Sequence, residues 1–247
     1  MARHGLAALG ACGASVAAWQ FYVASTRPRL QLTPQKTLFY VASTDDQIMD
    51  SLRTGDVLLF RRDCFFATPA AAIRCACNQR KEAAARVAAS QDAYPFDHCA
   101  VILADHLGTP MVLEVGPDGK AATTPYDRRI LSSRASDIVL RRLDGERGDV
   151  ASAVAAAFLE DPAAAAREAG VSAVEARGGI LAEALTKPDA WSSPSAELVA
   201  GFLAQAGMVK RDTGASKRRL VSDFTARRVV LREGMRWREG ERVIRSR

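Results

Sequence analysis

The chain has 247 residues, a net charge of +6, 48% hydrophobic residues and 25% charged residues. This composition excludes a disordered chain and a membrane protein with many spans. Five cysteines in this length are too few for a disulfide scaffold. The positive charge is concentrated in residues 201–247, which hold 13 Lys and Arg against 5 Asp and Glu. We therefore expect one domain of ordinary size with appended segments.

An uncharged N-terminal segment covers residues 5–25, and as a helix it would span roughly 30 Å, the thickness of a bilayer core. Trp19 and Tyr22 lie near its end, and Arg27 and Arg29 follow it, as is typical of a membrane interface. A membrane anchor, a signal peptide and a mitochondrial presequence are all consistent with this segment. The flanking residues favour the anchor. A signal peptide is less favoured because no cleavage site stands out, and a mitochondrial presequence is less favoured because the segment lacks the repeated arginines of such presequences.

The chain divides into four parts on this interpretation. They are a single-pass membrane anchor at 1–26, a linker at 27–44, a main domain at 45–226 and a basic region with short C-terminal strands at 227–247. The location that we favour is the mitochondrial inner membrane.

The main domain alternates apolar runs typical of strands with helical patterns. Pro194 opens one helix, and a glycine follows its last periodic residue. This order predicts an α+β fold, a small antiparallel sheet with surrounding helices. The expected elements are a helix at 45–52, a strand at 53–62, helices within 66–91, strands at 96–105, 110–115 and 137–143, alanine-rich helices interrupted at Pro162 and near 178–179, a helix at 195–207, and strands within 227–233 and 241–247.

Three short motifs follow one another in a distinctive order. LRTGDVLLF comes first, FDHCAVIL with MVLEV comes second, and PSAELVAGF comes third. Their order and spacing resemble the circularly permuted papain-like superfamily, which includes NlpC-type amidases of the YiiX/YaeF sort and the lecithin retinol acyltransferase group. The resemblance covers roughly residues 50–225 and implies a permuted papain-like domain.

The resemblance also implies roles for individual residues. His98 matches the catalytic histidine, Glu114 matches the polar residue that orients it, and Ser195 stands where the family has its nucleophilic cysteine. Gly55 and Asp56 match the Gly-Asp pair that precedes the first strand. The sequence departs from the family at its most important position, because Ser195 replaces the thiol.

The chemistry of this replacement indicates a lost activity. A cysteine in the first turn of a helix has its thiolate stabilised by the helix N-terminus and by an imidazolium. The hydroxyl of Ser195 is too weak an acid for such an ion pair and needs an aligned base. Ser-His-Glu triads do work in some esterases, so a serine hydrolase remains an alternative. Cys99 is not expected to act instead of Ser195, because it alternates with His98 along a strand and should face the core.

The remaining cysteines and basic residues suggest no cofactor. Cys64, Cys75 and Cys77 fall at least one ligand short of a metal site, so we expect no metal. Phe224 and Trp237 are the aromatic residues among the C-terminal arginines, too few for a single-stranded nucleic-acid site. An acidic protein surface or anionic lipid headgroups are the expected partners of this region.

The sequence therefore predicts a catalytically inactive papain-like protein that serves as an accessory subunit of a membrane complex, with a mitochondrial location. The first alternative is an active amidase or ester hydrolase that uses Ser195, His98 and Glu114 on a lipid or peptide substrate. The second alternative is an RNA- or ribosome-associated subunit.

Overall fold

A computed structural model gives the structure of the central part of the chain. The described residues are 44–62, 76, 79, 96–116, 119–133, 135–171, 193–210, 221–225, 229–238 and 241–242. The predicted anchor at 1–26 lies outside them, as does the linker apart from its last residue. Cys64, Cys75 and Cys77 also lie outside, together with all but residues 76 and 79 of the helices expected within 66–91.

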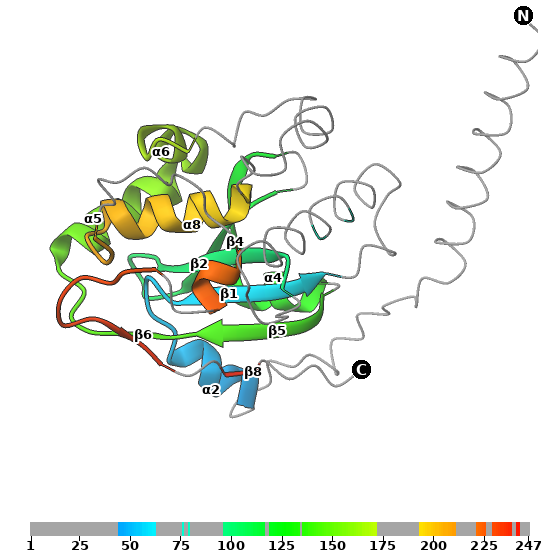
Figure 1. Cartoon of the computed structure of the whole chain (residues 1–247). Coiled ribbons are helices and arrows are strands. Elements are labelled where there is room, and N and C mark those ends of the chain that lie inside the picture. Colours follow the sequence, from blue (N-terminus) through cyan, green and yellow to red (C-terminus); the bar gives the residue numbers. More distant parts are fainter. Residues whose placement is uncertain are drawn as a thin grey trace, which may run out of the picture.

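An antiparallel sheet of six strands forms the centre of the domain (Figure 1). Its order is β4-β3-β2-β1-β5-β8, so each strand from β1 to β4 lies beside its neighbour in the sequence. A second sheet has two short strands, β6 and β7. The bounds are β1 Val57–Arg62, β2 His98–Ala104, β3 Pro110–Val115, β4 Ala121–Pro125, β5 Ala135–Arg141, β6 Leu143–Asp144, β7 Arg236–Trp237 and β8 Glu241–Arg242.

Helices cover both faces of the six-stranded sheet. One apolar core joins the sheet to α5, α6, α8 and α9, and Figure 1 shows α5, α6 and α8 above the sheet. A second core joins the opposite face to α2 and α4. The bounds are α2 Thr44–Asp50, α4 Tyr126–Ser132, α5 Asp149–Glu160, α6 Pro162–Glu168, α8 Pro194–Gln205 and α9 Val221–Thr225.

Successive side chains of β1 and β2 enter different cores, as the geometry of a strand requires. Leu59 and Cys99 are partners across the two strands and face α8. Phe60 and His98 are the next pair, and Phe60 belongs to the core beneath α4. Because both faces are covered, the run from Val57 to Phe60 is fully buried and has no polar alternation.

The Gly55–Asp56 pair closes the turn that leads into β1. Gly55 has φ of 95°, and a Cβ at this position would lie 2.5 Å from the Met208 sulfur. The buried Asp56 carboxylate accepts hydrogen bonds from the Leu143 backbone N–H at 3.0 Å and from Arg147 at 2.9 Å. Burial raises the pKa of Asp56, although these donors act in the opposite direction. The pair therefore connects the start of the large sheet to β6.

The structure confirms the predicted α+β class and the antiparallel sheet with surrounding helices. The strands expected at 53–62, 96–105, 110–115 and 137–143 form β1, β2, β3 and β5. The helix opened by Pro194 is α8, and it is followed by Gly207 with φ of 67°.

Other predictions about the elements were incomplete or wrong. Strand β4 and helix α4 were missed, because β4 is a short AATTP segment and Pro125 precedes α4 without a side-chain cap. The described part of 227–233 forms no strand but a single bridge between Leu231 and Val209. A strand does form within the expected range 241–247, because β8 at Glu241–Arg242 pairs with β5. Strand β7, which pairs with β6, was not expected.

Candidate functional site

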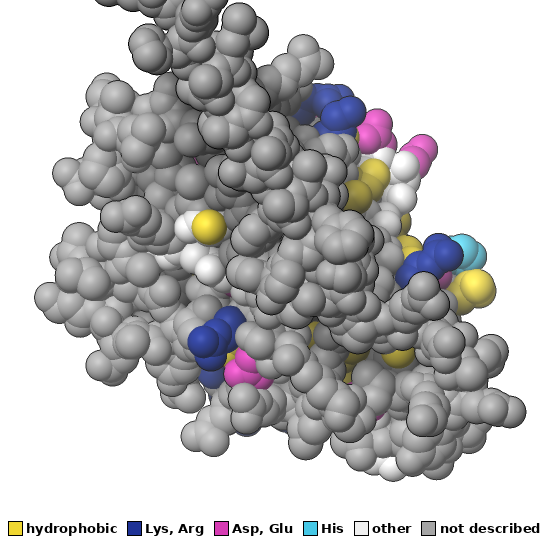
Figure 2. Space-filling model, turned by 90° about the vertical axis from the view of Figure 1, so that its right-hand side faces the viewer, with side chains coloured by type: hydrophobic (Ala, Val, Ile, Leu, Met, Phe, Trp, Pro, Cys, Tyr) yellow, Lys and Arg dark blue, Asp and Glu magenta, His cyan; other side chains and the backbone are white. Residues whose placement is uncertain are grey.

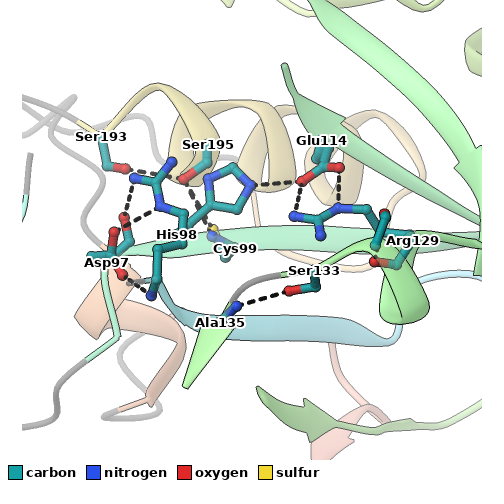
Figure 3. Close-up of polar contacts among 11 residues, drawn as sticks. Asp97, His98, Cys99, Glu114, Arg129, Ser133, Ala135, Ser193 and Ser195 are labelled. Carbon is teal, nitrogen blue, oxygen red and sulfur yellow. Dashed lines mark hydrogen bonds and ion pairs between the residues drawn. The ribbon is translucent and has the colours of Figure 1, made fainter. Parts of the chain in front are cut away.

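His98 begins β2 and is held by a carboxylate on the neighbouring strand. Its side chain is 6% exposed, and Nε2 lies 2.8 Å from Oε2 of Glu114 on β3. Its ring centroid lies 5.7 Å from that of Phe60, its partner on β1. The predicted pairing of His98 with an orienting Glu114 is therefore present in the structure (Figure 3).

Arg129 on α4 holds the other side of the Glu114 carboxylate. Its Nη2 donates to Oε2 at 2.8 Å, and its Nε donates to Oε1. The guanidinium carbon lies 4.6 Å from the centroid of the Phe60 ring, a cation–π contact. Burial alone would raise the pKa of Glu114, but hydrogen bonds and charge from His98 and Arg129 lower it to about 2. Glu114 is therefore ionised at neutral pH.

The surroundings of His98 favour the neutral form of its imidazole over the charged form. Burial lowers its pKa, the nearby Arg62 charge lowers it further, and the Glu114 carboxylate only partly offsets these effects. Arg62 on β1 is itself paired with Asp97, with 2.7 Å between Nε and Oδ2. Because the Glu114 carboxylate accepts a hydrogen bond from Nε2–H, Nδ1 carries the lone pair of the neutral ring.

Ser195 makes a different set of contacts at the start of α8. Its Oγ accepts from the Cys99 backbone N–H at 3.3 Å and lies 3.7 Å from the Cys99 sulfur. The Ser193 hydroxyl is 3.2 Å away, so Ser195 can donate its own proton there. Ser193 is the N-cap residue of α8, but its side chain makes no capping hydrogen bond. The Ser195 hydroxyl is buried, with its hydrogen-bonding capacity used within the protein.

The structure does not join the three predicted site residues in one hydrogen-bonded triad. Ser195 contacts Cys99, whose side chain enters the core beneath α8. His98 is the next residue along β2 and lies with Phe60 and Arg129 on the α4 side. Among the described residues no hydrogen bond joins His98 to Ser195. The alternation of side chains along β2 keeps them apart.

The arrangement contains an oriented base without a nucleophile aligned to it. A triad needs the nucleophile within about 2.6–3.2 Å of the base, or a short movement from that position. Here the hydroxyl of Ser195 is bonded to β2 and to Ser193 instead. Arg129 was missed by the sequence analysis, since α4 was not predicted and no motif marks the residue. Cys99 faces the core, as predicted, and is completely buried.

The comparisons with known proteins identify no relative. A scan against protein-family models finds no match, and searches of curated proteins and of solved structures find none. The site is therefore interpreted from its geometry.

Within the described part of the chain, no helix is long and apolar enough to cross a membrane. The predicted anchor at 1–26 lies outside that part.

The described basic residues near the C-terminus are partly neutralised within the protein. Arg236 and Arg238 both pair with Asp144, at 3.3 Å and 2.7 Å. On the face in Figure 2, the described Lys and Arg side chains lie beside acidic ones and form no single basic patch. The described residues thus give the predicted contact with an acidic or lipid partner no additional support.

Proposed function

We propose that this protein is a catalytically inactive relative of the circularly permuted papain-like hydrolases. One observation carries the proposal. The Ser195 hydroxyl is buried and hydrogen-bonded to Cys99 and Ser193, and no hydrogen bond joins it to His98 among the described residues. A hydroxyl in this position links α8 to the sheet and is not prepared for attack on a substrate.

The resemblance to the permuted family rests on several features besides Ser195. The Gly55–Asp56 pair lies directly before the first strand of the antiparallel sheet. A histidine begins the second strand, and a carboxylate on the third strand orients it. The helix that starts beside position 195 packs against the second and third strands. These features support a shared architecture, with the chemistry at position 195 changed.

We further propose that the protein is an accessory subunit of a membrane complex, with a mitochondrial location. The support is the uncharged segment 5–25 and its flanking aromatic and basic residues in the sequence. An inactive domain on an anchor is suited to assembly with other subunits. Mild solubilisation followed by native separation tests this part. The protein should migrate in a large assembly, and migration as a single chain would contradict it.

The loss of activity is tested with a serine-directed fluorophosphonate probe on the full-length protein. We expect no labelling at Ser195, with a known serine hydrolase as the positive control. Labelling of the wild type that disappears in both Ser195→Ala and His98→Ala would refute the proposal. It would establish the alternative, a serine hydrolase with His98 as base. The circular dichroism spectra of the variants show whether they are folded.

A further inference from the structure

The contacts of Arg129 extend the proposed function, on which this inference rests. Arg129 approaches Glu114 with two nitrogens, and the geometry fixes both carboxylate oxygens. The side chains are largely buried, with Arg129 at 16% and Glu114 at 12% exposed. Two parallel hydrogen bonds from a guanidinium restrict a carboxylate more than one bond does.

The position of His98 depends on this carboxylate. Within the described part of the chain, the hydrogen bond of the ring is the one between Nε2 and Glu114, and the ring also lies against Phe60. Arg129 stacks over the same Phe60 ring from α4. Arg129, Glu114 and His98 thus form a chain of contacts from α4 to the first residue of β2, and Arg129 and His98 both lie against the Phe60 ring.

We propose that Arg129 is a positioning residue, which fixes the hydrogen bond between Glu114 and His98 on the α4 side of β2, out of reach of the side chain at position 195. The site has then lost its chemistry for two separate reasons. The nucleophile is a hydroxyl, and the base is held on the other side of the strand. A thiol restored at position 195 would not form an ion pair with His98.

The charges around His98 agree with this role. Arg62 approaches from β1, Glu114 from β3 and Arg129 from α4, while Asp97 is the preceding residue and is bonded to Arg62. Burial lowers the pKa of His98 most, and the positive charges of Arg62 and Arg129 lower it further. An imidazolium, which a papain-like thiolate requires as its partner, is therefore disfavoured here.

The first arm of the test follows His98 by NMR in full-length protein labelled with ¹⁵N-histidine. The chain has three histidines, and the His98→Gln variant assigns the signal of interest. We expect one Nε2–H tautomer in the wild type. Arg129→Gln should mix the tautomers and raise the pKa of His98, because a positive charge and the clamp are both removed. Arg128→Gln is the matched control, since Arg128 is the exposed neighbour on the same helix.

Arg129→Lys is a second variant, which keeps the test possible if Arg129→Gln does not fold. Lysine keeps the charge but lacks the planar fork, so it should also mix the tautomers, with a smaller change in the His98 pKa. An unchanged tautomer and pKa in both folded Arg129 variants would overturn the proposed role.

The second arm restores the thiol with Ser195→Cys, under a phosphine reductant, and measures alkylation at that position by mass spectrometry across pH. Adding His98→Ala should leave the pKa of the new thiol unchanged and should change its alkylation rate by less than about twofold, because stabilisation by the start of α8 does not involve His98. A depressed thiol pKa that depends on His98 would overturn the inference. That result would leave the inactivity of the wild type intact, whereas fluorophosphonate labelling of the wild type would refute the proposed function itself.

Discussion

Replacement of Glu114 by glutamine removes the charge from the centre of the buried network while preserving the shape of the side chain. The carboxylate contacts His98 and Arg129, and its side chain is only 12% exposed. Glutamine can still accept the Nε2 proton of His98. It leaves the mostly buried Arg129 without its counter-charge, which is the costly consequence of breaking such a pair.

The pKa of Glu114 sets the magnitude of this effect. The network lowers that pKa from an ordinary value of 4.5 to about 2. Each pKa unit is worth about 1.4 kcal/mol, so the charged form contributes about 3 kcal/mol to the free energy of unfolding. Because the folded pKa is the lower one, this contribution is complete above pH 4.5 and is lost as the pH falls from 4.5 towards 2. Protonation in this range makes the wild type resemble the glutamine variant.

Urea denaturation followed by circular dichroism measures the difference between Glu114→Gln and wild type. We expect about 3 kcal/mol at pH 7, and a difference that shrinks below pH 4.5. Glu160→Gln is the matched control, because Glu160 is exposed at the end of α5 and should change stability by less than about 0.5 kcal/mol. A difference at pH 7 that stays the same at low pH would show that the charge of Glu114 is not what stabilises the fold.

Two further predictions concern the turn before β1 and the start of α8. Gly55→Ala should cost about 2–3 kcal/mol in unfolding experiments, since it adds a clash with Met208 to an unfavourable φ. Gly108 has a similar φ of 80°, but an added Cβ would contact nothing there, so Gly108→Ala should lower the free energy of unfolding by only about 1 kcal/mol. Equal losses of stability in the two variants would rule out the clash with Met208. In Ser195→Cys, mild oxidation should join the new thiol to Cys99, whose sulfur lies 3.7 Å from the present hydroxyl. Peptide mass spectrometry after oxidation checks this, and two free thiols would contradict it.

The sequence predicted the sheet well because its signals were local. Four apolar runs became β1, β2, β3 and β5, and the Pro194 signal located the start of α8 within one residue. Strand β4 and helix α4 gave no comparable signal. Their AATTP and YDRRILS segments have little apolar periodicity, and they are stabilised by the neighbours they pack against.

The candidate site was predicted in its parts but not in its arrangement. His98 and Glu114 are paired because they lie on adjacent strands, which the order of motifs implied. The alternation that placed Cys99 in the core also separates His98 from Ser195, which contacts Cys99. Predicting that His98 and Ser195 make no hydrogen bond requires knowing which face of the sheet α8 covers. The sequence carries no local signal for such a tertiary contact. The same applies to Arg129, which reaches Glu114 from a helix that was not predicted.

The structural role of Asp56 bears on what a Gly-Asp motif in a sequence can indicate. The carboxylate joins the turn before β1 to β6, and Gly55 fits beside Met208, without contact between either residue and His98 or Ser195 in the described structure. Selection for folding alone would preserve such a pair after catalysis has disappeared. A Gly-Asp match in a distant sequence thus reports on how the sheet is closed. Whether a protein with this motif is an active enzyme must be judged from the residues at the position of the nucleophile, at the start of the helix that corresponds to α8.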